Sequence, residues 1–209
     1  MTTPFLTVAN VRFIAQQVNK LLNARINSKD QDVVRAVKDI AIAEIREQIT
    51  TDEAILTAIG NIQDRIDADL FLDSLKAYTI PFKAVSEKGL QKLFRKDKKL
   101  KLPNLESIDW QSISYLSWRD PGTHRQYIVI DEDGQFKALR GVTDPQHATR
   151  GICAICQQHT NVHLFTATVK RNADSFTSYS NYICDDVEKC NAKLTDYEKL
   201  VSFIDRNLV

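Results

Sequence analysis

The chain has 209 residues, which is enough for one large or two small domains. Hydrophobic residues make up 43% and charged residues 26% of it, as in ordinary globular proteins, and this composition argues against global disorder. The net charge of +1, from 28 basic and 27 acidic residues, argues against a general attraction to nucleic acid or to an anionic membrane.

The sequence contains no sign of membrane insertion or secretion. No stretch approaches the roughly 20 apolar residues that a membrane-spanning helix needs. The N-terminal sequence MTTPFLTVANVRF lacks the basic start and the continuous apolar run of a signal peptide. We therefore expect a cytoplasmic protein without membrane contact. Stable disulfides are rare in that compartment, so the four cysteines need another explanation.

Residues 1–80 have the apolar periodicity of helices. Apolar side chains recur every three or four positions in four successive segments, which places them on one face of each segment. The segments start near Val8, at Asp30 or Asp32, near Thr51 and near Asp67, and the last one ends at Tyr78 with Leu70, Phe71, Leu75 and Tyr78 on its buried side. Four short amphipathic helices with short connections predict an antiparallel four-helix bundle.

Pro81 marks the predicted domain boundary, because helices tend to end just before a proline. The prediction is a helical bundle domain at 1–80 and an α/β domain at 81–209. The second domain is expected to begin with a helix from Ser86 to Phe94, despite Gly89.

A basic run follows that helix, RKDKKLK at residues 95–101. In a functional interpretation it contacts RNA or an acidic patch on a partner. In a structural interpretation it is a solvated, lysine-rich connector. The sequence alone favours the connector, because such short runs are common on protein surfaces.

Strand patterns then replace helical ones. Tyr127–Asp131 and Phe136–Gly141 flank the turn sequence EDGQ and predict a β-hairpin. The segments 162–170 and 176–184 predict a second hairpin across residues 171–175. The chain closes with a predicted helix from about Thr195, its expected N-cap, to Asn207.

The four cysteines are spaced Cys-x2-Cys, 27 intervening residues, then Cys-x5-Cys, and they are Cys153, Cys156, Cys184 and Cys190. The first pair lies in a tight turn typical of a zinc knuckle, the second hairpin separates the pairs, and a helix follows the second pair. This is the order of a treble-clef zinc finger, predicted over residues 151–209. Four thiolates satisfy the tetrahedral preference of zinc and leave no open position for water or substrate, so we expect one structural Zn²⁺.

Several alternatives remain at this stage. A redox Cys-x-x-Cys motif would not account for the second pair, and two disulfides are disfavoured by the compartment. His159 or His163 could replace one ligand, although ordinary histidines near the site are the simpler interpretation. A zinc-dependent enzyme would need an open ligand position. A zinc-finger protein that binds RNA or the ribosome is the main alternative function; residues 81–209 hold only 19 basic against 16 acidic residues, which is a weak excess for such a protein.

The sequence resembles the FusB-type fusidic-acid resistance proteins, also called elongation factor G-binding proteins. The matching segments run through most of the chain: Ile80-Pro81-Phe82, Leu90-Gln91-Lys92-Leu93-Phe94, Leu102-Pro103, Trp118, Tyr127-Ile128-Val129, Gly151 to Cys156, Asn181-Tyr182-Ile183-Cys184, Cys190 to Thr195 and Phe203-Ile204-Asp205. The cysteine spacing and the segments around Cys184 and Cys190 are the specific part of this resemblance.

The resemblance implies an α+β protein, with an N-terminal antiparallel four-helix bundle followed by an α/β domain containing a treble-clef zinc finger. It implies a non-enzymatic protein, expected to be a monomer, that binds the C-terminal domains of elongation factor G. Such proteins promote release of the factor from ribosomes stalled by fusidic acid, touch the ribosome at most transiently, and leave the drug unaltered. Residues that match contact positions of the family are Ile152, Tyr179, Tyr182 and Phe203; Ile152 stands where the family has an aromatic residue, and Tyr179 where it has a lysine.

Overall fold

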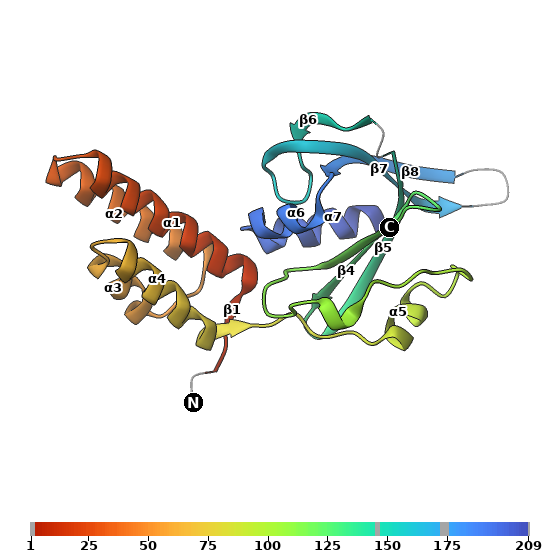
Figure 1. The fold of residues 1–209 in the computed structure, drawn as a ribbon, viewed down its shortest axis with the longest axis horizontal. Helices are drawn as coiled ribbons and strands as arrows, with labels where there is room; N and C mark the ends of the chain where they lie inside the picture. Colours follow the sequence, from red (N-terminus) through yellow and green to blue (C-terminus); the bar gives the residue numbers. More distant parts are fainter. Residues whose placement is uncertain (1–2, 145–146, 172–175, 209) are drawn as a thin grey trace. The chain divides into compact units, whose positions relative to one another are not determined.

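The structure is a computed structural model that describes residues 3–144, 147–171 and 176–208. It divides into two compact units, Met1–Ile80 and Pro81–Val209 (Figure 1). Each unit has its own hydrophobic core. None of the helices in the described ranges combines the length and hydrophobicity required to cross a membrane.

The first unit is the predicted helical bundle, which is confirmed. Its helices are α1 (Val8–Asn27), α2 (Gln31–Gln48), α3 (Glu53–Asn61) and α4 (Arg65–Ser74), and α4 continues into the 3₁₀ turn η1 (Leu75–Tyr78). Each α-helix begins after a residue whose side-chain oxygen accepts a hydrogen bond from a backbone N–H in the first turn: Thr7, Asp30, Asp52 and Asp64. These caps satisfy donors that the helix itself leaves unpaired.

The last helix corrects one core prediction. Leu70 is 68% exposed, whereas Ala68 and Leu75 are buried. The reason is that α4 starts at Arg65, so that Ala68, Leu72 and Leu75 face the core and Leu70 lies on the opposite side with Ile66. A short parallel pair, β1 (Leu6–Thr7) with β2 (Thr79–Ile80), joins the two ends of the unit and was not predicted.

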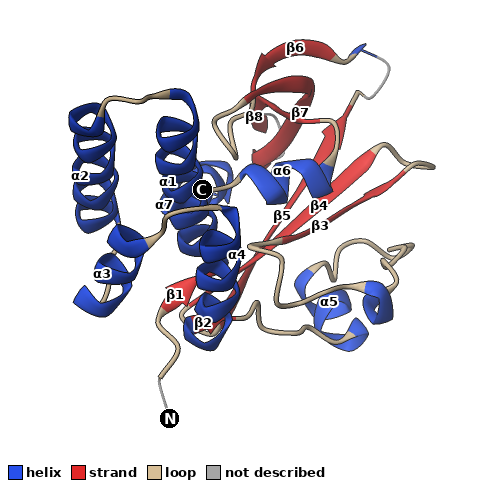
Figure 2. Ribbon diagram, turned by 60° about the vertical axis from the view of Figure 1, so that its left-hand side comes forward, coloured by secondary structure: helices blue, strands red, loops and turns tan. Residues whose placement is uncertain are grey.

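The second unit is built on an antiparallel sheet of six strands. They are β3 (Leu116–Asp120), β4 (Arg125–Glu132), β5 (Gln135–Thr143), β6 (Thr149–Ile152), β7 (His159–Arg171) and β8 (Phe176–Cys184). The order is β3-β4-β5-β7, and β6 and β8 both pair with β7. The curved sheet is visible in Figures 1 and 2.

Both predicted hairpins are confirmed. The β4–β5 hairpin turns at Asp133 and Gly134, which have φ angles of 50° and 80°. Positive φ at both central residues is what a tight hairpin turn with the twist of its strands requires, and Asp-Gly supplies it at low cost. The β7–β8 hairpin pairs Val162 with Cys184 and Arg171 with Phe176, and residues 172–175 of its predicted connection lie outside the described residues. Strands β3 and β6 were not predicted.

The described part of the unit also contains three α-helices, α5 (Glu87–Leu93), α6 (Val187–Lys193) and α7 (Tyr197–Leu208), and the 3₁₀ turn η2 (Leu105–Ser107). α7 packs on the concave side of the sheet (Figure 1). The Phe165 and Phe203 rings lie 6.1 Å apart, and the Tyr197 hydroxyl donates to the carbonyl oxygen of Asp131 (2.6 Å). The predicted cap at Thr195 is wrong, because the Asp196 carboxylate accepts from the Lys199 N–H (3.1 Å) and α7 begins two residues later than expected.

Candidate metal centre and interaction surface

The first cysteine pair lies in a tight turn directly after β6. The N–H of Gln157 donates to the carbonyl oxygen of Cys153 (2.9 Å), and the N–H of Cys153 donates to the carbonyl oxygen of Gln158 (3.1 Å). Gln157 has a φ of 58°, which is uncommon for a residue other than glycine. The turn therefore folds back on itself and directs Cys153 and Cys156 to one side.

The second pair comes from the end of β8 and from α6. Cys184 is the last residue of β8, and Cys190 lies on α6, four residues after Asp186. Asp186 caps this helix by accepting from the Lys189 N–H (3.0 Å), and this hydrogen bond lowers the pKa of the Asp186 carboxyl. The cap fixes where α6 begins and so which way Cys190 points.

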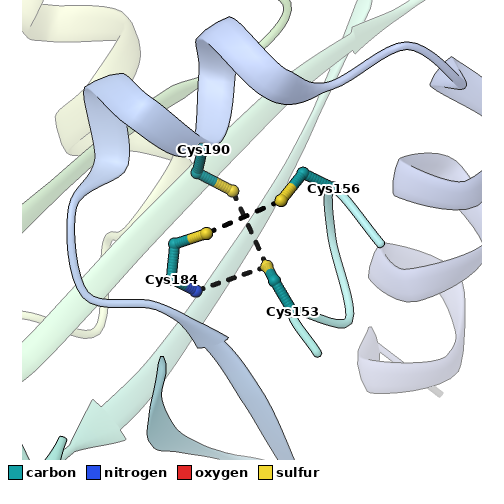
Figure 3. Close-up of side chains that lie close together, drawn as sticks. All are labelled: Cys153, Cys156, Cys184 and Cys190. Carbon is teal, nitrogen blue, oxygen red and sulfur yellow. Dashed lines mark hydrogen bonds between the residues drawn. The ribbon is translucent and has the colours of Figure 1, made fainter. Parts of the chain in front are cut away.

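The four sulfur atoms meet in the interior of the unit (Figure 3). All lie within 4.8 Å of one another, with Cys153 Sγ 3.7 Å from Cys190 Sγ and Cys156 Sγ 3.6 Å from Cys184 Sγ. Zinc–sulfur bonds of about 2.3 Å in a tetrahedron place the sulfurs roughly 3.8 Å apart. The observed spacing fits that geometry, all four residues are buried, and none forms a disulfide.

The close approach of the four thiols shifts their pKa values in opposite directions. Hydrogen bonds from the thiols of Cys156, Cys184 and Cys190 lower the pKa of Cys153. The same contacts with Cys153 raise the pKa of the Cys190 thiol. Backbone N–H groups of Ile155 and Cys184 also donate to the Cys153 sulfur, both at 3.3 Å. Negative charge is thus stabilised on the Cys153 sulfur, as a thiolate ligand requires.

Residues behind the cysteines hold them in place. The Asn191 side chain accepts from the Ser114 N–H (2.7 Å) and donates to the Tyr115 carbonyl oxygen (2.8 Å), so α6 is fastened to the segment that leads into β3. Tyr115 is fully buried beside the site, and burial, followed by the nearby Cys190 sulfur, raises the pKa of its hydroxyl. Tyr115 was not identified from the sequence, and Asn191 was named there only as part of the family-matching segment from Cys190 to Thr195.

Neither histidine near the site belongs to the donor cluster in the described residues, which consists of the four cysteines. His159 is exposed at the start of β7. His163 is buried, lies 3.2 Å from the Gln126 side-chain oxygen and contacts Arg119. Burial, followed by the positive charge of Arg119, lowers the pKa of His163, so it acts as a neutral structural residue.

Of the four residues predicted to contact a partner, three are on the surface. Ile152 is 54% exposed, and Tyr179 and Tyr182 are each 50% exposed. Phe203 is fully buried against Phe165. Its assignment to a contact surface is therefore corrected: α7 turns this ring into the core, where the apolar stripe of the helix faces the sheet.

The two exposed tyrosines lie on opposite faces of β8. They are three residues apart, and side chains alternate between faces along a strand. Tyr182 is paired with Leu164, whereas Tyr179 is paired with Ala167 on the side that α7 covers further along. On the side of Tyr182, Val142 pairs with Thr166 of β7. Val142, Leu164 and Tyr182 are all exposed and form what we call the open face.

Leu164 and Val142 were not identified from the sequence, although the alternation along β7 contains a usable signal. His163, Phe165 and Ala167 are buried, so Leu164 must point to the other side of the strand. An antiparallel sheet with one solvated face normally carries polar residues there. Exposed apolar side chains on that face indicate an interaction surface.

Comparison with known protein families agrees with this architecture. Residues 5–83 match a model described as elongation factor G-binding protein, N-terminal, and residues 89–203 match a model described as FBP C-terminal treble-clef zinc-finger. The second match alone spans more than half of the chain. The chain belongs to the FusB-type family of elongation factor G-binding proteins.

A solved structure of a FusB-type protein is similar over nearly the whole length. It is titled as the structure of the fusidic acid resistance protein FusC, and it shares 31% sequence identity with a TM-score of 0.82. The superposition covers 98% of this chain and 97% of FusC. No sequence in a search of curated proteins gave a match.

Membership of the family agrees with the site described above. The order of knuckle, hairpin and helix is that of a treble-clef zinc finger, the fold named by the C-terminal family model. The buried cluster of four cysteines provides one structural zinc site in this FusB-type protein. Bound there, zinc would tie the knuckle, the end of β8 and α6 together.

Proposed function

We propose that this protein binds elongation factor G and promotes its release from ribosomes stalled by fusidic acid, so that it protects the drug's target. The contact involves the zinc-bearing unit of this protein and the C-terminal domains of the factor. The protein acts as a cytoplasmic monomer and touches the ribosome only transiently. Membership of the elongation factor G-binding family and the similarity to FusC support the choice of partner.

The observation that carries the proposal is the open face beside a metal-tied scaffold. Leu164 and Tyr182 are a cross-strand pair, and the carbonyl oxygen of Tyr182 accepts from the Ala154 N–H in the knuckle (2.7 Å). Ile152, two residues before Ala154, is exposed at the edge of the knuckle. An exposed tyrosine with aliphatic neighbours on a rigid strand has the character of an interface hot spot.

Tyr179 has a different place in this proposal. Because it projects from the opposite face of β8, a flat partner surface centred on Tyr182 does not cover it. Ile152 pairs with His159 of β7, so the same alternation places it on the side of Tyr179. Of the residues matched to the family's contact positions, we therefore keep Tyr182 at the centre of the contact and leave Ile152 and Tyr179 outside a flat contact on the open face.

A binding protein can accelerate release without catalysing a reaction. A partner moves an equilibrium only by its differential affinity for two states. Preference for the departing form of elongation factor G over the drug-stalled form would lower the barrier to departure, and each tenfold gain in rate requires about 1.4 kcal/mol. A zinc-tied surface needs little ordering on binding, so more of the contact energy remains for this discrimination.

Direct binding is the first expected outcome. Titration calorimetry of the zinc-loaded protein with elongation factor G is expected to show a one-to-one complex, with the negative heat-capacity change that accompanies burial of an apolar face. Ovalbumin or another unrelated protein at the same concentration serves as the control. No detectable complex with the zinc-loaded protein would refute the choice of partner.

Faster release is the second expected outcome. Ribosomes stalled with labelled elongation factor G and fusidic acid are expected to lose the factor several times faster when the protein is added, because the protein stabilises the departing form. Dwell time of the labelled factor on immobilised ribosomes measures this. Tight binding in solution together with an unchanged dwell time would mean that elongation factor G is a partner but that the proposed release mechanism is wrong.

A further inference from the structure

The basic run at residues 95–101, which we call the basic segment, concentrates the positive charge of its unit. Residues 88–101 contain seven basic residues and one acidic residue, whereas the remainder of 81–209 holds twelve basic and fifteen acidic residues. All five basic side chains of the segment itself are exposed. The modest total charge of the unit therefore hides a strongly cationic patch.

The single acidic residue of the segment points inward. Asp97 has a side chain that is only 4% exposed, and its Oδ1 atom accepts from Arg125 (3.1 Å) and Arg140 (2.5 Å). These arginines belong to β4 and β5, so Asp97 fastens the segment to the sheet. The negative charge of Asp97 is neutralised by these two arginines, so the outward side of the segment carries only cations.

The segment is also held at both ends, which distinguishes it from a free connector. Phe94, just before it, packs edge-on against Trp118 and Tyr127, with ring centroids 5.7 and 4.9 Å apart. At the other end the Trp118 indole N–H donates to the Lys101 carbonyl oxygen (2.9 Å). Hydrogen bonds from Asp97 to Phe94 and from Leu100 to Asp97 close two successive turns between these anchors. A surface fixed in this way loses little conformational entropy when it binds.

Most of these cations lack a partner within the protein. Lys101 lies 3.5 Å from Asp120, but Arg95, Lys96, Lys98 and Lys99 form no ion pair with any described residue. A cleft of about 260 Å³ adjoins them, and Arg95, Lys96 and Arg140 line it. The rest of its lining is Asp97, Thr168, Asn207 and the apolar residues Leu93, Phe94, Ala138, Leu139 and Leu208. Unpaired cations beside a recess suit an anionic group such as a phosphate.

The chemistry of the patch distinguishes between classes of partner. Within residues 81–141 no large apolar side chain is exposed. Leu208, which lines the cleft, is 42% exposed, but a single such residue is less than the apolar centre that protein interfaces normally have. Binding to a nucleic-acid backbone needs only cations placed against phosphates. We infer that the basic segment is a second interaction surface, separate from the open face, and that it contacts the phosphate backbone of structured RNA. The choice of RNA among polyanions rests on the proposed function at the ribosome.

The test uses the whole zinc-loaded protein and a fluorescently labelled RNA hairpin, without elongation factor G. The variant replaces Lys96, Lys98 and Lys99 by Gln. The matched control replaces Lys29, Lys193 and Lys199, three exposed lysines elsewhere that likewise have no ion pair with described residues. Both variants lose the same charge, and thermal unfolding verifies that both stay folded.

Anisotropy titrations at several salt concentrations are expected to separate them. The segment variant should bind the hairpin roughly tenfold or more weakly at low salt. The slope of the logarithm of its binding constant against the logarithm of the salt concentration should become shallower by about two, since each lost phosphate contact contributes about 0.7–0.9 to that slope. The control should stay within about twofold of the wild type.

Three results would overturn the inference: no binding of the hairpin by the wild type at low salt, equal losses in both variants, or tighter binding to phosphatidylserine vesicles than to RNA. Calorimetry of the segment variant with elongation factor G is expected to match the wild type. If that affinity falls while RNA binding is unchanged, the segment serves a protein partner instead. The RNA titration contains no elongation factor G. A negative result in that titration therefore refutes the role of the basic segment without refuting the proposed function.

Discussion

Removal of zinc is expected to unfold the unit at 81–209 and to leave the helical unit folded. The metal joins three elements that otherwise meet through buried sulfur atoms, and structural zinc sites contribute about 10–16 kcal/mol of apparent binding free energy. A domain with a net stability of about 5–15 kcal/mol does not tolerate a loss of that size. The helical unit has a separate core and contains no cysteine.

The chain contains a convenient reporter for this experiment. Both tryptophans, Trp110 and Trp118, lie in the second unit, where they pack against Phe82 and Phe94 respectively. Tryptophan fluorescence therefore follows that unit alone, and the helical unit is an internal control read by far-ultraviolet circular dichroism. Chelation should shift the fluorescence and preserve most of the helical signal. Cys184→Ser should behave like chelation, and unchanged fluorescence in both cases would show that the fold does not depend on the metal.

Replacement of Tyr182 by Ala is expected to weaken the complex with elongation factor G by roughly 30-fold or more. Truncation of an aromatic hot spot costs about 2 kcal/mol or more, and Tyr182 lies at the centre of the proposed contact. Its side chain is half-exposed on a strand, so its loss leaves the core intact. The dissociation constant from calorimetry measures the effect.

Tyr179→Ala is the matched control for that substitution. The residue type, strand and exposure of 50% are the same, but the side chain lies on the other face of β8. We expect its affinity for elongation factor G to change by about threefold or less. Equal losses for the two variants would mean that the partner wraps around the edge of β8, and a loss only for Tyr179→Ala would place the contact on the wrong face.

The sequence was most informative where chemistry is local. The cap residues Asp30 and Asp52, the Asp-Gly turn and the cysteine spacing each determine the backbone within a few residues, and their predicted elements are present in the structure. The four cysteines also bring distant segments together, because a metal has fixed requirements for its ligands. Spacing alone was therefore enough to predict the site.

Features that depend on packing between distant segments were harder to predict. β6 has four residues, TRGI, and only its pairing with β7 makes it a strand. Leu70 was predicted to be buried and is exposed, whereas Phe203 was predicted to contact a partner and is buried. An apolar residue on a helix can face either the core or the solvent, and the neighbouring elements determine which. The opposite orientations of Tyr179 and Tyr182 follow from strand alternation once β8 is established, but not from a match to family positions.

β7 pairs with β6 along one edge and with β8 along the other, and this double pairing has a consequence for how the strands align. Val162 is paired on both edges of β7, with Thr149 of β6 and with Cys184 of β8. A slip of β8 by one residue along β7 would turn Tyr182 inward and Ile183 outward, and it would also carry Cys184 away from the Cys153 sulfur. Only one alignment lets the knuckle and the end of β8 share an ion. The metal thus fixes the register between the strands, and the register determines which side chains the sheet presents to the solvent.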